Sequence, residues 1–75
     1  MMEPPGDWKR VARREWILER GSLSGEARIR EVEGGFKASI EVEDVDFGMR
    51  LLEEEEFFQP EREAREFVRR KMEEV

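Results

Sequence analysis

Hydrophobic and polar residues alternate with a period of two across the middle of the chain. In the segment FKASIEVE, residues 36–43, every second residue is apolar. Because successive side chains of a strand point to opposite faces of a sheet, this alternation predicts a strand with one buried face. The preceding segment EARIREVE, residues 26–33, is joined to it by Gly34 and Gly35, and a glycine pair is typical of a two-residue hairpin turn.

A turn at Gly34 and Gly35 sets the register of this predicted hairpin. Ile29 then lies opposite Ile40 on the apolar face, and Ala27 lies opposite Val42. The pairing of apolar side chains with one another across the two strands favours this register.

A third strand is predicted over FGMRLLEE, residues 47–54, after the loop EDVD at residues 43–46. A loop of this length pairs Val42 with Phe47 and continues the apolar face onto the new strand. Three of its side chains are therefore expected to face the core: Phe47, Met49 and Leu51.

The C-terminal segment has the periodicity of a helix. Pro60 suits the first helical position, because proline fixes φ and lacks an N–H group that would be unpaired there. The apolar residues that follow recur every three or four positions and form one stripe: Ala64, Phe67, Val68, Met72 and Val75. Such a stripe predicts a helix that packs on one face of the sheet.

The N-terminal third is compatible with two structures. Residues 14–20, REWILER, fit a fourth strand, whereas residues 7–20 also fit a helix. We favour a short helix or arm up to Arg14 followed by a strand, because a helix would place the adjacent Ile17 and Leu18 on different sides.

These elements predict an α+β fold: a three- to four-stranded antiparallel meander with a C-terminal helix packed on one face and a short helix or arm at the N-terminus. Residues 1–7 have no periodic pattern and are expected to form a flexible arm, and residues 8–75 to form a single small domain. The predicted core consists of Trp16, Leu18, Ile29, Phe36, Ala38, Ile40, Val42, Phe47, Met49, Leu51, Phe57, Phe67, Val68 and Met72.

Composition narrows the functional classes. The chain has 75 residues, of which 45% are charged, and a formal net charge of −6. Abundant glutamate and arginine with few thermolabile side chains are typical of heat-adapted proteins, so a thermophilic source is our hypothesis. No apolar run approaches the roughly 20 residues that span a bilayer, and the first ten residues lack the apolar centre of a secretory signal. We therefore predict a soluble cytoplasmic protein.

Catalytic and metal chemistry are poorly supported. The chain has no His, Cys, Tyr or Thr, so its serines have no imidazole to activate them. The acidic loop EDVD offers carboxylates but lacks the glycine-bearing twelve-residue calcium loop, and a zinc site has no nitrogen or sulfur ligands. We predict no enzymatic activity, no metal and no cofactor.

Two basic clusters favour an alternative as a nucleic-acid-associated module. One lies in the N-terminal third and the other on one face of the predicted helix: Lys9, Arg10, Arg13 and Arg14, and Arg62, Arg65 and Arg69. Three strands followed by a helix are similar, at the level of architecture, to double-stranded-RNA-binding domains and small antitoxin-like domains. The net negative charge opposes phosphate binding, so we regard nucleic acid as the less favoured partner.

The run Glu53–Glu56 has two interpretations. As the charged exit of a strand, it would discourage intermolecular pairing next to Phe57 and Phe58, which are expected to turn back under the sheet. As a functional surface, it would be an acidic docking site, or part of an inhibitor of phage or mobile-element type that mimics nucleic acid.

Apolar residues that the predicted core does not absorb favour a protein partner or a homodimer. Ile17, Val32 and Leu52 are expected among charged residues on the face that the helix leaves open, and Trp8 has no place in the predicted core. The candidate partner-binding residues are these four together with Glu53, Glu54, Glu55 and Glu56. The leading hypothesis is therefore a small non-catalytic protein-interaction domain that uses these residues and has no membrane partner.

Overall fold

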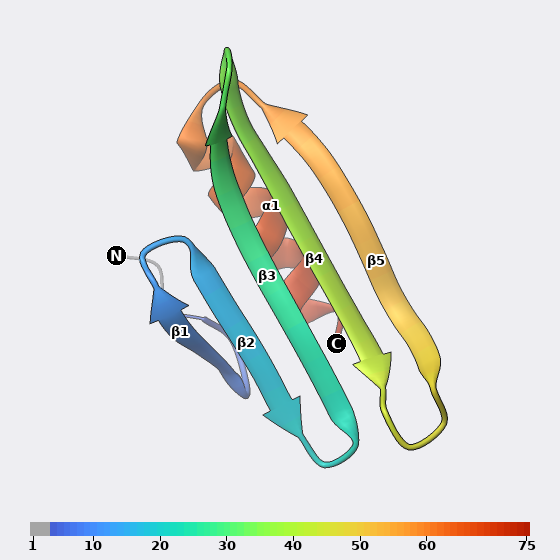
Figure 1. The fold of residues 1–75 in the computed structure, drawn as a ribbon. Helices are drawn as coiled ribbons and strands as arrows, with labels where there is room; N and C mark the ends of the chain where they lie inside the picture. The colour runs from blue at the N-terminus through green and yellow to red at the C-terminus, as the bar shows by residue number, and fades with distance from the viewer. Residues whose placement is uncertain (1–3) are drawn as a thin grey trace.

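The computed structural model describes residues 4–75 and contains one five-stranded antiparallel sheet and one C-terminal helix (Figure 1). The predicted α+β class is confirmed, but the sheet has five strands rather than three or four. The first three residues of the predicted arm lie outside the described residues. The elements are β1 Trp8–Ala12, β2 Glu15–Arg20, β3 Leu23–Val32, β4 Gly35–Asp44, β5 Met49–Phe58 and α1 Glu61–Glu73.

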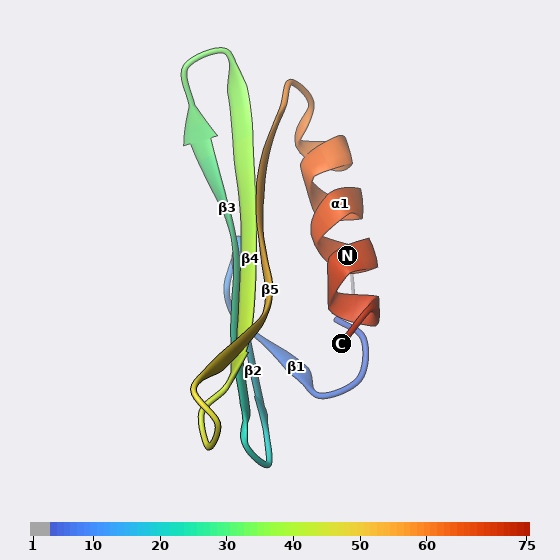
Figure 2. The same cartoon turned by 90° about the vertical axis from the view of Figure 1, so that its right-hand side faces the viewer.

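The strands follow one another across the sheet in sequence order, from β1 at one edge to β5 at the other. Figure 2 shows that α1 covers one side of the sheet and that β1 turns out of the sheet towards the C-terminal end of the helix. We call the side that α1 covers the core face and the opposite side the outer face.

The predicted N-terminal helix is wrong, because the segment before Arg14 forms β1. Trp8 pairs with Leu18 across β1 and β2, and its side chain is only 5% exposed. Gly25 on β3 makes room for the indole: a Cβ there would lie 2.9 Å from Trp8 Cη2 and 3.0 Å from Val42 Cγ2. Burial of this large ring explains why the segment is extended, and the predicted strand that follows it is confirmed as β2.

The β3–β4 hairpin is confirmed, but its register is shifted by two residues from the prediction. Ile29 lies opposite Ala38 and Ala27 lies opposite Ile40. A shift of two residues keeps each side chain on its predicted face, so Ile29 and Ile40 are both buried in the core.

The two glycines of this hairpin have different structural roles, which explains the shift. Gly34 has φ of +84°, the left-handed conformation that the turn needs, whereas Gly35 is the first residue of β4. A Cβ on Gly35 would lie 2.4 Å from the carbonyl oxygen of Phe58, so glycine is required there for close approach of the end of β5. The turn therefore consists of Glu33 and Gly34.

The predicted register of β5 is wrong. Val42 lies opposite Leu52 rather than Phe47, because β4 continues to Asp44 before the chain turns. The Asp44 carboxylate accepts hydrogen bonds from the backbone N–H groups of Asp46 at 3.1 Å and Phe47 at 3.3 Å, and this stabilises a four-residue loop that begins two residues later than predicted. The pairing then shifts by one residue after Val42, which leaves Leu51 without a partner on β4.

The core lies between the core face of the sheet and α1. The buried residues are Trp8, Trp16, Leu18, Ala27, Ile29, Ala38, Ile40, Val42, Ala64, Phe67, Val68 and Met72. The predicted helical stripe is confirmed by the buried residues of α1. Phe58 closes the end of the core against Phe67, with 5.4 Å between ring centroids. Four residues predicted for the core are instead exposed: Phe47, Met49, Leu51 and Phe57.

Candidate interaction surfaces

Two of the apolar residues predicted to bind a partner are not on the surface as expected. Trp8 is buried in the core, and Leu52 lies on the core face, where it packs against the buried cluster. Ile17 and Val32 do lie on the outer face and are partly exposed. They are far apart, because Ile17 pairs with Glu26, six residues before Val32 on β3, a separation of roughly 20 Å along a strand.

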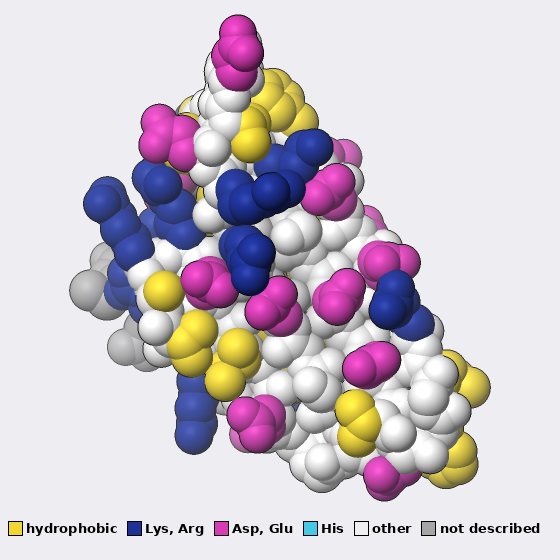
Figure 3. Space-filling model, viewed as in Figure 1, with side chains coloured by type: hydrophobic (Ala, Val, Ile, Leu, Met, Phe, Trp, Pro, Cys, Tyr) yellow, Lys and Arg dark blue, Asp and Glu magenta, His cyan; other side chains and the backbone are white. Residues whose placement is uncertain are grey.

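Charged side chains of both signs cover the centre of the outer face, and hydrophobic side chains lie towards its margins (Figure 3). Arg50 illustrates the pairing, because its hydrogen bond to Glu53, together with the nearby Glu41, raises its pKa above the ordinary value. The ion pairs of this face are Arg28–Glu15 at 3.4 Å, Arg28–Glu26 at 3.6 Å, Arg30–Glu55 at 3.8 Å, Lys37–Glu55 at 3.8 Å and Arg50–Glu53 at 2.7 Å. Its charges are thus largely paired within the chain.

The run Glu53–Glu56 was predicted to lie where a strand ends, but it lies inside β5. Strand alternation divides the four carboxylates between the two faces, because Glu53 and Glu55 share the outer face with their ion-pair partners. Glu54 lies on the core face and pairs with Lys71 of α1 at 2.7 Å, and this hydrogen bond raises the pKa of Lys71. Glu56 has no ion pair with any residue from 4 to 75.

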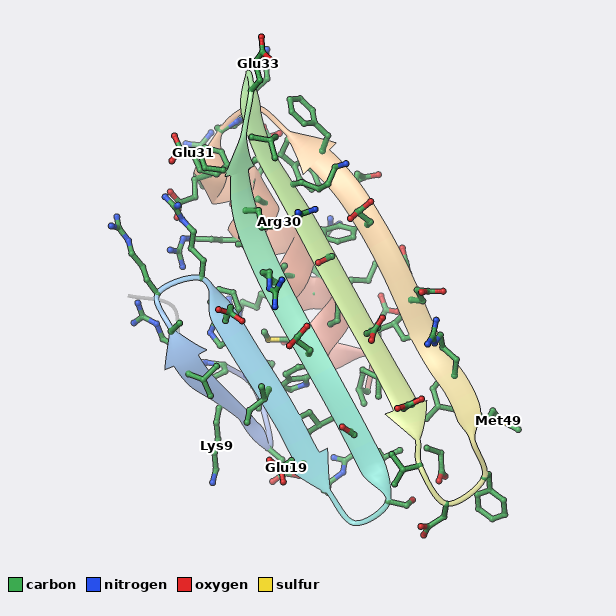
Figure 4. The ribbon with its side chains drawn as sticks, viewed as in Figure 1. Lys9, Glu19, Arg30, Glu31, Glu33 and Met49 are labelled. Atoms are coloured by element: carbon green, nitrogen blue, oxygen red, sulfur yellow. The ribbon has the colours of Figure 1, made fainter. Side chains whose placement is uncertain are left out.

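The exposed large apolar side chains gather along one edge of the sheet. The part of the chain that the structure describes has six of them, and five lie in β5 or the loop before it. We call these five the apolar edge: Val45, Phe47, Met49, Leu51 and Phe57, with exposed fractions of 54%, 81%, 57%, 49% and 47%. Figure 4 shows Met49 at the start of β5 with its side chain directed away from the sheet. Sequence reasoning missed this surface because the wrong register placed three of its residues in the core.

The two predicted basic clusters meet on one surface, although they are about fifty residues apart in the sequence. Side chains of the β1–β2 turn and of α1 line a shallow hollow of about 600 Å³ there, formed by Arg13, Glu61, Arg62, Arg65, Glu66 and Arg69. Lys9 does not join them: it is not among the residues that line the hollow, and Figure 4 shows its side chain extending outwards from β1. Arg10 donates hydrogen bonds to the carbonyl oxygens of Ala12 and Arg13 and so belongs to the turn itself.

Two arginines of these clusters are held by Glu61 at the start of α1. Arg14 Nη2 lies 3.0 Å from Glu61 Oε1, and Arg65 Nη2 lies 2.7 Å from Glu61 Oε2. The hydrogen bonds from Arg14 and Arg65 lower the pKa of the Glu61 carboxyl. The Arg14 guanidinium also lies over the Phe36 ring, 5.2 Å from its centroid. Arg14 therefore ties the β1–β2 turn to the helix through Glu61, and Arg65 does so by donating a hydrogen bond to the carbonyl oxygen of Arg13 at 3.4 Å. Arg13, Arg62 and Arg69 are left without ion pairs among residues 4–75.

Within the described residues, no group of three or more His, Cys, Asp or Glu side chains is arranged to hold a metal ion. None of the helical segments in that same range has the length and apolar character needed to cross a bilayer. Comparison of the chain with protein-family models, with curated proteins and with solved structures gives no match.

Proposed function

We propose that this protein is a small non-catalytic interaction domain that binds another protein through the apolar edge. The observation that supports this most directly is that five of the six exposed large apolar side chains of residues 4–75 lie along β5 and its preceding loop. Val45, Phe47, Met49 and Leu51 lie within seven residues at one end of this edge, and Phe57 lies six residues further along β5. Exposed apolar groups along one edge favour association, because covering them with a partner removes them from water.

The chemistry of the apolar edge also suits a protein partner. Phe and Met are enriched at the centres of protein interfaces, and Phe47 and Met49 are the two most exposed members of this surface. The core does not depend on these residues, because they lie outside the buried cluster. We further propose that the domain acts in the cytoplasm, since a chain without cysteine needs no oxidising compartment.

Site-specific photocrosslinking tests this proposal. A photoreactive aromatic amino acid at position 47 replaces a side chain that is 81% exposed, so the fold should be retained. We expect irradiation in the source cells to give a defined protein adduct, and the substitutions Met49→Ser and Leu51→Ser to abolish it. The matched control places the same group at Arg62 on the opposite side of the molecule. Equal adducts at both positions, or none at position 47, would contradict the proposal.

A second candidate function is binding of nucleic acid through the hollow where the two basic clusters meet. The observation that favours it is the convergence of Arg13 with Arg62 and Arg69, none of which has an ion pair in residues 4–75. If these arginines contact phosphates, the affinity for random duplex should fall steeply with salt. Each Arg→Gln substitution should then reduce the slope of log affinity against log salt by about one. A slope that the three substitutions leave unchanged would exclude this surface as the binding site.

A further inference from the structure

The outer edge of β5 is open for strand pairing. β5 is the last strand of the sheet and has a neighbour on one side only. Its seven residues from Leu52 to Phe58 pair with β4 without irregularity, so the backbone N–H and C=O groups on the other side are regularly spaced along the edge. A regular, exposed edge of this kind is a template for an added strand.

The opposite edge of the sheet is less suited to pairing. β1 has five residues, and its register is irregular between Arg10 and Ala12. Figure 2 shows β1 turning out of the sheet. Short length, irregularity and twist are among the devices that protect an edge strand, and β5 has none of these three from Leu52 onwards. Its protection is the charge of Glu53–Glu56, which acts against some added strands and not others.

The charge of β5 selects the kind of strand that can be added. The four side chains of Glu53–Glu56 lie on both faces of the strand, so a neighbouring strand would meet a carboxylate at each of four successive positions. Cross-strand side chains lie close together, and opposite charges there attract. A strand with a run of Lys or Arg would therefore be complementary to β5 on both faces. Its cations would meet Glu56, which has no ion pair in the described chain, and would compete with the internal partners of Glu53, Glu54 and Glu55.

A second copy of β5 is disfavoured by the same charges. In a symmetric antiparallel pair, a two-fold axis through any residue of Glu53–Glu56 places that glutamate opposite its own copy. Like charges directly opposite one another destabilise a pair of strands. The glutamate run therefore opposes self-pairing over this segment and leaves the edge available to a basic partner.

We propose that β5 binds an extended, basic segment of a partner protein by strand addition, with Lys or Arg of the segment opposite Glu53–Glu56. This inference deepens the proposed function, since it names the chemistry of the partner that the apolar edge would contact. Apolar residues flanking the basic run would pack on Leu51 at one end and Phe57 at the other, both about half exposed.

The test uses synthetic peptides of about nine residues, a usual strand length, with four central Lys or Arg residues and apolar residues at the ends. Two further peptides carry the same sequence with N-methyl groups on alternate backbone amides, one on the odd and one on the even positions. Strand addition uses the amides of one set only, because alternate residues of a strand point their N–H groups to opposite sides. We expect one N-methylated peptide to bind roughly tenfold or more weakly and the other to bind nearly as well as the parent.

Charge-reversed variants locate the site on the protein. Glu56→Lys should weaken binding of the parent peptide. Glu19→Lys, which makes the same charge change at an exposed residue of β2, should have little effect. Failure of the parent peptide to bind, equal binding of both N-methylated peptides, or equal weakening by the two variants would each overturn strand addition. Head-to-tail assembly of the protein alone, seen by sedimentation and not reversed by the peptide, would also overturn it. A specific photocrosslink at position 47 alongside such a result would leave the proposed function standing.

Discussion

Substitution of Gly35 by alanine tests how β5 is positioned on β4. The added Cβ would lie 2.4 Å from the carbonyl oxygen of Phe58, 2.9 Å from Cζ of Phe57 and 3.0 Å from Cα of Gln59. Two of these three atoms belong to the backbone, so the clash can be relieved only by moving the connection from β5 to α1. Overpacking of this kind costs about 1–3 kcal/mol, and we expect the upper half of that range for Gly35→Ala.

Gly34→Ala is the matched comparison, since the two glycines are adjacent. A Cβ on Gly34 meets nothing within 4 Å, so the cost comes only from holding an L-residue at φ of +84°. That cost is about 1 kcal/mol, and Gly34→Asn should recover part of it, because asparagine tolerates this conformation. Gly35→Asn should recover nothing, because the obstacle there is steric.

Urea unfolding followed by tryptophan fluorescence measures these effects, because Trp8 and Trp16 are both buried. A domain of this size has a total stability of roughly 4–11 kcal/mol, so a loss of 2 kcal/mol shifts the midpoint clearly. If Gly35→Ala proved as stable as the wild-type protein, or less damaging than Gly34→Ala, the close approach of β5 to β4 would be refuted.

Three further predictions concern other parts of the structure. Leu52→Ala should lower the free energy of unfolding in urea by about 1–2 kcal/mol, because Leu52 packs against the core. Leu51→Ala should change it by less than about 0.5 kcal/mol, because Leu51 is exposed. A larger loss for Leu51→Ala than for Leu52→Ala would support the register predicted from the sequence. Glu61→Gln should cost roughly 1 kcal/mol at pH 7. Because the folded-state pKa of Glu61 is lowered, the stability that its charge provides is fully present above the ordinary glutamate pKa of about 4.3 and is lost as the pH falls through the folded-state pKa. The difference in stability between Glu61→Gln and the wild-type protein should therefore shrink below about pH 4. A difference that stays constant with pH would contradict the ion-pair assignment. Glu41→Lys should raise the melting temperature slightly, because Glu41 lies opposite glutamates on both neighbouring strands, and a lowered melting temperature would argue against that register.

The sequence pattern predicted correctly on which face of the sheet most side chains of β3 and β4 lie, but it did not predict how neighbouring strands are aligned. Strict alternation over residues 36–43 placed Ala38, Ile40 and Val42 correctly in the core, because a register shift of two residues does not change the face. The two hairpin glycines could not be told apart from sequence, since one is required for its positive φ and the other for the space beside Phe58.

The surface predictions failed where a non-local feature decided the outcome. The exposure of Phe47 and Met49 depends on the later position of the β4–β5 loop and on the irregular pairing after Val42, neither of which has a marker in the composition of the segment. The burial of Trp8 depends on the absence of a side chain at Gly25, seventeen residues later. The convergence of the two basic clusters likewise requires the tertiary arrangement, although each cluster was evident in the sequence.

Hydrogen exchange of the β5 amides tests the central claim, that the outer edge of β5 is open and receives an added strand. In the free protein, we predict alternate amides from Leu52 to Phe58 to be protected by β4 and the intervening amides to exchange rapidly. The rapidly exchanging set should become protected when the basic peptide is bound. Protection of every β5 amide in the free protein, or no change at saturating peptide, would contradict the account.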